Sequence, residues 1–322
     1  VPLEPARVER RGLKRSYNIG GWCLFFHFIG SNIVALMLME LITLILTALN
    51  KGVDSDVISS YMNGSSILAA INMVTYIAAN VGLAAIGFKW SKTDYRSIIR
   101  PHGYNFAYAV QYCLIAMFIW FATTYLSLGI ENIFDKFGYS VIVSDSEDIG
   151  VTGIGYAVMT VYTCIIAPIT EEIFYRGMLL KVTSRANQRF AIFLTAVFFG
   201  LAHGNIPQFD LAFFLGIFLA HITLKHNSIV PAIVVHIFVN TSVTLLSLTD
   251  GNDNAEAAAT MLLLAGAVVG LCLLLMFRKR DRLPATTPKQ SRRGFAIAKT
   301  SVPIVLSFCF EVVYMLLLIF MK

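Results

Sequence analysis

The stretch Ala167-Pro168-Ile169-Thr170-Glu171-Glu172-Ile173-Phe174-Tyr175-Arg176-Gly177 places two adjacent carboxylates and an arginine inside a long apolar segment. That segment, residues 151–180, is long enough to cross a bilayer at roughly 1.5 Å of helix per residue. A charged side chain near the bilayer centre is costly, so ionisable groups there usually serve a site or pair with one another inside a bundle. The rest of the chain must therefore supply partners for this stretch.

The whole chain has the composition of a polytopic membrane protein. Of its 322 residues, 57% are hydrophobic and only 14% are charged, and the mean hydropathy is +0.71. Repeated apolar stretches of about twenty residues predict an all-α transmembrane bundle with about nine helices, eight at the fewest. The expected spans cover residues 22–49, 66–88, 106–128, 151–180, 190–203, 209–224, 229–248, 257–277 and 295–321.

The domain organisation expected from this pattern is simple. Residues 1–18 form a basic cytosolic segment, and residues 19–321 form a single transmembrane domain. The first span contains His27 and Glu40, which are expected to be polar residues facing the bundle. The five cysteines lie in apolar stretches without CxxC spacing, so they are interpreted as buried thiols rather than as a disulfide framework.

The positions of the basic residues predict the orientation of the chain. With the N-terminus inside, the cytosolic segments hold 21 of the 25 lysines and arginines. This bias is typical of the positive-inside rule, and it explains the net charge of +6 without a nucleic-acid partner. We therefore expect a multi-pass protein of the cell membrane, with a cytosolic N-terminus and an external C-terminus, whose partners are the lipid bilayer and a peptide or membrane-protein substrate.

Three separate spans bring ionisable side chains to similar depths in the cytosolic half of the membrane. Counted from the nearest cytosolic residue, Glu171 lies roughly 15 Å in, His203 roughly 20 Å and His236 roughly 13 Å. Chance would scatter such residues along their helices. The coincidence predicts a shared site.

Helix geometry divides the charges of the opening stretch. Glu172 and Arg176 are four residues apart and can pair on one face, either as structural neutralisation or as part of catalysis. Glu171 points roughly 100° away and is free to face a cavity, where a desolvated carboxylate suits proton transfer from water. Pro168 is expected to kink the helix and open room for that water. His236 and Asn240 share one face, and an amide beside an imidazole suits an oxyanion.

These residues resemble the CAAX protease and bacteriocin-processing (CPBP, or Abi) family of intramembrane endopeptidases. The family pattern is EExxxR, then FxxxH, then HxxxN. It is matched by the set from Glu171 to Arg176, by Phe199 to His203 and by His236 to Asn240. The resemblance covers about residues 151–247, the predicted catalytic core.

The resemblance implies a function and a role for each position. Glu171 would be the general base that activates water, assisted by His203. His236 and Asn240 would form the oxyanion hole, and Glu172 and Arg176 would support the motif helix. The implied reaction is hydrolysis of a peptide bond in a membrane-associated, prenylated or otherwise hydrophobic peptide, without a cofactor.

Three alternatives stay open. Glu171, His203 and His236 could instead hold zinc in a metal-dependent protease, although the sequence lacks HExxH. A non-catalytic membrane scaffold, or a bacteriocin self-immunity or regulatory protein, could use the same fold to bind a partner. A transporter or proton relay is less well supported, because no repeated halves are evident.

Overall fold

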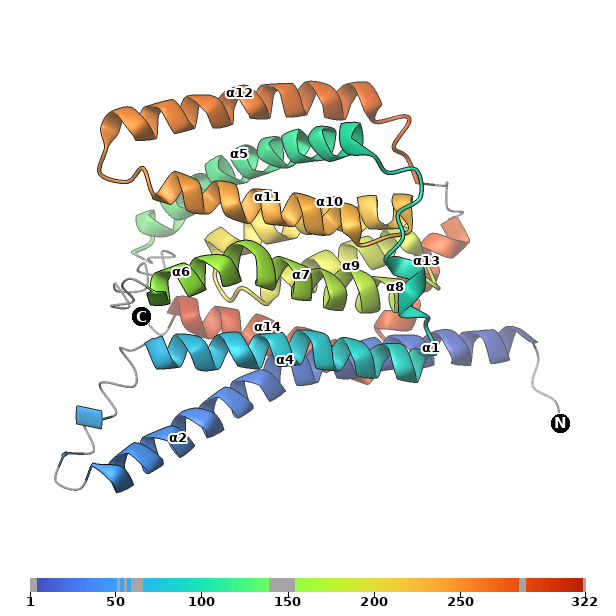
Figure 1. The fold of residues 1–322 in the computed structure, drawn as a ribbon. Helices are drawn as coiled ribbons and strands as arrows, with labels where there is room; N and C mark the ends of the chain where they lie inside the picture. Colours follow the sequence, from blue (N-terminus) through green and yellow to red (C-terminus); the bar gives the residue numbers. More distant parts are fainter. Residues whose placement is uncertain are drawn as a thin grey trace.

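The computed structural model describes residues 5–50, 53–54, 57–58, 66–138, 154–283 and 288–320. In this part of the chain every element is helical and no strand occurs, which confirms the predicted all-α class (Figure 1). The elements in chain order are α1 (Pro5–Phe25), η1 (Phe26–Gly30), α2 (Ser31–Leu49), α4 (Ser66–Ser91), η2 (Tyr95–Ile98), α5 (Phe106–Lys136), α6 (Ile154–Val161), η3 (Tyr162–Ile166), α7 (Ala167–Glu172), η4 (Ile173–Leu179), α8 (Leu180–Thr183), α9 (Gln188–Leu201), α10 (Ile206–His226), α11 (Val230–Ser247), α12 (Asp253–Phe277), α13 (Pro288–Ala298) and α14 (Val302–Phe320).

The described helices confirm a polytopic membrane bundle. Seven helical segments are long and apolar enough to cross a membrane, and two shorter apolar helices, Gln188–Leu201 and Val302–Leu318, accompany them. In order and number these correspond to the nine predicted spans. The first three residues of the fourth predicted span, and most of the loop before it, lie outside the described residues.

The structure adds detail at both ends of the bundle. α1 begins at Pro5, within the basic N-terminal segment, and Tyr17 is fully buried in the core. The last predicted span is not continuous, because α13 ends at Ala298 and α14 begins at Val302. Mean hydropathy does not reveal an amphipathic helix such as α13, because such a helix buries its apolar face whatever its average polarity.

Two predictions of burial in the outer helices were partly wrong. His27 is buried as expected, but Glu40 lies on an exposed face of α2. All five cysteines are free thiols, and Cys23 and Cys164 are buried, whereas Cys272 and Cys309 are exposed on helix surfaces. An apolar sequence neighbourhood does not distinguish a helix face that packs on protein from one that faces lipid.

Asparagine side chains cap the starts of α5, α9, α10 and α12. Asn105, Asn187, Asn205 and Asn252 each accept a hydrogen bond from the backbone N–H three residues ahead. Such caps satisfy an amide that the helix itself leaves free. These caps define where four of the helices begin after a reversal of the chain.

The helices pack around the segment α6 to α8, some as antiparallel neighbours, such as α5 and α12, and others in parallel, such as α1 and α14. Figure 1 shows α12 beside α5 on one side of the bundle and α1, α4 and α14 on the other, while α2 diverges from it. One hydrophobic core joins α1, the η4 segment, α9 and α14, and a second joins α5, α10 and α11. The motif helix thus lies between two packed layers.

Candidate active site

The double glutamate occupies a short α-helical segment between two wider π-helical turns. In η3 the N–H of Ala167 bonds the carbonyl of Tyr162, and after η4 the N–H of Leu180 bonds the carbonyl of Tyr175, both five residues back. Pro168 stands at the start of α7, where its missing N–H costs little. The expected irregularity at Pro168 is therefore a widened helix, a feature that is frequent at functional sites.

The two carboxylates have different environments, as their helical positions predicted. Glu172 is completely buried, whereas 25% of the Glu171 side chain is exposed. Because successive helical residues diverge by about 100°, Glu172 points into the packed interior and Glu171 toward a cavity. This arrangement separates a structural carboxylate from an accessible one.

Glu172 connects the motif helix to α11. Its Oε1 accepts a hydrogen bond from Arg176 Nη1 at 2.8 Å and another from His236 Nδ1 at 2.9 Å. An ionised carboxylate only accepts, so His236 carries a proton on Nδ1. The predicted pair with Arg176 is present, and the contact with His236 is an addition that the sequence did not reveal.

His236 also faces the second carboxylate. Its Nε2 lies 3.8 Å from Glu171 Oε2, so the ring stands between the two glutamates. Glu171, His203, His236 and Asn240 all line one cavity of about 410 Å³. The four residues predicted to be catalytic, drawn from three separate helical regions, therefore meet around a common space.

The ring of Phe199 contacts the guanidinium and the two imidazole groups of the site. The Arg176 guanidinium lies 4.1 Å from its centroid, a cation–π distance. The rings of His203 and His236 meet Phe199 edge-on, at 5.2 and 5.6 Å between centroids. Phe199 thus contacts the buried arginine and both histidines of the site.

Hydrogen bonds to the backbone orient His203 and Asn240. His203 Nδ1 donates to the carbonyl of Phe199 at 2.8 Å, which leaves Nε2 as the acceptor of a neutral ring. Asn240 Nδ2 donates to the carbonyl of Thr163 at 2.9 Å, inside the π-helical turn η3. The amide of Asn240 keeps a second N–H for another acceptor.

Sequence reasoning missed the cavity wall contributed by the first two spans. His27 lines the cavity, and its Nε2 donates to Asn80 Oδ1 at 2.8 Å. Asn80 Nδ2 in turn donates to Thr170 Oγ1 at 3.3 Å, beside the glutamates. A usable signal existed, because His27 lies twelve residues after Arg15, roughly 18 Å deep and level with the site.

Among the described residues, no cluster of three or more His, Cys, Asp or Glu side chains has the arrangement that would hold a metal ion. His236 Nδ1 is engaged by Glu172 and His203 Nδ1 by a carbonyl, so the Nε2 atoms of both rings stay free. A carboxylate, two imidazoles and an amide thus border one cavity.

Fold and site together define a polytopic α-helical membrane protein with a buried carboxylate–imidazole centre. Residues 153–242 match the family model described as Rce1-like, type II CAAX prenyl endopeptidase Rce1-like. The match confirms the resemblance carried by the three motifs, and it falls within the predicted core of residues 151–247. Comparison with curated proteins and with solved structures returned no match.

Proposed function

We propose that this protein is an intramembrane endopeptidase in which Glu171 activates water for attack on a peptide bond. The observation that carries the proposal is the convergence of Glu171, His203, His236 and Asn240 on one cavity. The endopeptidase family matched by residues 153–242 supports the reaction class. The substrate class that suits the site is a hydrophobic, membrane-associated peptide.

Each side chain has a role that its contacts allow. Water held between Glu171 and the Nε2 of His203 gives its proton to the Glu171 carboxylate. The hydroxide oxygen forms a bond to the scissile carbonyl carbon, and the carbonyl oxygen becomes an oxyanion. The free N–H of Asn240 donates to that oxyanion, and the Glu171 proton passes to the departing amine as the carbon–nitrogen bond breaks.

The charges around His236 bear on its role. Glu171, Glu172 and Arg176 carry a net charge of −1 when all are ionised, and an imidazolium at His236 brings the group to zero. In that form Nδ1–H stays on Glu172 at 2.9 Å, and Nε2–H becomes a second donor to the oxyanion. Glu172 and Arg176 are then positioning residues, since both are sealed from the cavity.

The test compares Glu171→Gln with wild type and with Glu40→Gln, which makes the same change on an exposed face of α2. Peptides released from membranes carrying each variant are identified by mass spectrometry, and the cut peptide is then assayed with purified protein. We expect Glu171→Gln to lower the cleavage rate by about 10²–10⁴-fold and Glu40→Gln to leave it unchanged.

Two outcomes would overturn parts of the proposal. If no peptide depends on Glu171, the chain is not a glutamate-dependent protease, and a scaffold or regulatory role is favoured. If a chelator abolishes cleavage and zinc restores it, the zinc alternative is favoured over metal-free catalysis.

A further inference from the structure

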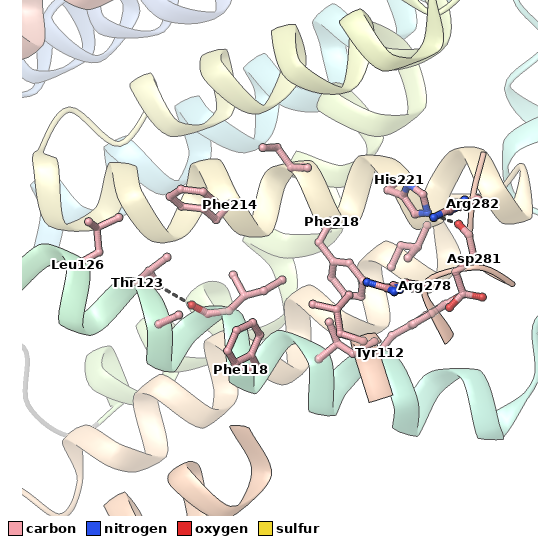
Figure 2. A pocket seen from close by; sticks show the side chains of 16 residues that line it. Tyr112, Phe118, Thr123, Leu126, Phe214, Phe218, His221, Arg278, Asp281 and Arg282 are labelled. Carbon is pink, nitrogen blue, oxygen red and sulfur yellow. Dashed lines mark hydrogen bonds between the residues drawn. The ribbon is translucent and has the colours of Figure 1, made fainter. Parts of the chain in front are cut away.

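A second cavity, of about 450 Å³, also lies along α10, but a different set of α10 side chains lines it from those that line the candidate active site. Leu211, Ala212 and Leu215 of α10 face the first cavity, whereas Phe214 and Phe218 line the second. We call the second cavity the outer groove. Figure 2 shows it between the helices that carry Thr123, Phe214 and Phe218 and the segment that carries Arg278 to Arg282.

The outer groove is apolar along most of its length. On α5 it extends from Tyr112 to Leu126, fourteen residues or roughly 21 Å of helix. That length covers about two thirds of a hydrocarbon core of ~30 Å. Its apolar lining consists of Ile115, Phe118, Ile119, Ala122, Phe214, Ile217, Phe218, Ile222 and Leu274. A flexible hydrocarbon chain lying parallel to the helices matches this shape.

One end of the outer groove is charged, and its single carboxylate is already neutralised. Asp281 pairs with Lys225 and accepts from Arg280 Nε at 2.9 Å and from Gln111 Nε2 at 3.1 Å. His221 Nε2 bonds the Asp281 carbonyl at 2.6 Å, which holds this segment against α10. The carboxylate is therefore not available to the two remaining arginines.

Arg278 and Arg282 line this end of the groove and are exposed. Within the described part of the chain neither makes a hydrogen bond or an ion pair, although Arg280 beside them makes three hydrogen bonds. Arginine presents paired N–H groups that suit phosphate oxygens. The end of the groove thus offers two uncompensated cations next to a hydrocarbon-lined channel.

We propose that the outer groove is a binding site for an anionic phospholipid. One acyl chain lies along α5 and α10, and the phosphate rests between Arg278 and Arg282. A zwitterionic lipid would bring its own cation beside the arginines, and a free phosphate would leave the apolar channel unfilled. Basic pockets between helices at a membrane face are known to hold anionic headgroups. The site is separate from the proposed peptidase chemistry.

The first experiment measures lipid binding to the detergent-purified full chain by native mass spectrometry. Phosphatidylglycerol and phosphatidylcholine with identical acyl chains are titrated against wild type and R278Q/R282Q. We expect wild type to prefer phosphatidylglycerol, and the double variant to bind it about 25-fold more weakly, from about fivefold per arginine. The control K14Q/K279Q removes the same charge from exposed sites outside the groove and should keep the preference.

The second experiment separates the hydrocarbon channel from the headgroup site. Ala122 is exposed on the groove wall, so Ala122→Trp should fill the channel and weaken phosphatidylglycerol binding without lowering the unfolding temperature. Equal binding of both lipids by wild type, or an unchanged preference in R278Q/R282Q, would overturn the proposal. So would full competition by inorganic phosphate, insensitivity to Ala122→Trp, or a dimer that excludes lipid.

Discussion

At the residue scale, Glu172 accounts for the geometry of the site more than any other side chain. Its single oxygen Oε1 accepts from both Arg176 and His236, so it holds two helices in register. A buried carboxylate tolerates this environment only with charged or strongly donating partners. Its burial explains why Glu171 alone of the pair reaches the cavity.

We predict that breaking this buried pair destabilises the protein strongly. Arg176 is 1% exposed, so Arg176→Met leaves the Glu172 carboxylate without its cation and should lower the free energy of unfolding by about 3–5 kcal/mol. The double variant E172Q/R176M removes both charges and should recover much of that loss. Thermal unfolding in detergent measures both, with exposed Arg96→Met as the control. A double variant less stable than R176M would contradict the pair's role.

At the scale of elements, close contacts decide which helices lie together. α12 packs along α5, and a Cβ at Gly270 would overlap the backbone carbonyl of Leu114. A Cβ at Gly266, one turn earlier, would meet only the flexible end of the Met117 side chain. A Cβ at Gly270 would therefore require the backbone of one helix to move, whereas a Cβ at Gly266 would not.

The two glycines therefore form a matched test of the α5–α12 contact. Gly270→Ala should lower the free energy of unfolding by about 1–3 kcal/mol because the helices must separate. Gly266→Ala should cost clearly less, since a methionine side chain can change rotamer. Denaturation in detergent compares the two, and equal effects would show that the backbone approach at Gly270 is not limiting.

The segment that follows α12 is attached to α5 and α10 through Asp281. Burial raises the pKa of Asp281, but hydrogen bonds from Arg280 and Lys225 outweigh it and hold the pKa below its ordinary 3.8. A carboxyl whose pKa is lowered by folding stabilises the fold above its unfolded pKa. That stabilisation is lost as the pH falls through the folded pKa.

We accordingly expect Asp281→Asn to lower the free energy of unfolding by about 1–3 kcal/mol at neutral pH. The difference from wild type should shrink as the pH falls below 3.8, where the wild-type carboxyl also becomes neutral. Unfolding of both proteins is followed across this pH range. A difference that does not change with pH would mean that the ionised carboxylate is not what stabilises this attachment.

At the scale of the whole molecule, the basic segments gather at one end of the bundle. Figure 1 shows the start of α1 and the end of α14 at opposite ends of the bundle, with the end of α12 at the same end as the start of α1. This arrangement agrees with the alternation from which the orientation was predicted. The predicted orientation places the site within the cytosolic half of the membrane.

The orientation itself remains a prediction with a direct measurement. Epitope tags are added at either terminus, and intact cells are treated with an impermeant protease. We expect the C-terminal tag to be removed and the N-terminal tag to be protected until the membrane is permeabilised. If both tags lay on the same side, the chain would cross the membrane an even number of times, which would contradict the prediction.

The sequence by itself determined the helical class and the approximate spans, and its three motifs carried the resemblance to the endopeptidase family. Long apolar runs and ionisable residues inside them carry strong local signals, because the bilayer penalises each unpaired polar group where it stands. The same local reasoning predicted the different directions of Glu171 and Glu172, which helix periodicity alone dictates.

Only the tertiary structure decided which distant residues meet. The bond from His236 to Glu172, the wall formed by His27 and Asn80, and the burial of Tyr17 each depend on helix packing. So did the exposure of Glu40 and the break between α13 and α14. Periodicity places a side chain on a face of its own helix, but the partner of that face is selected by packing between helices far apart in the chain.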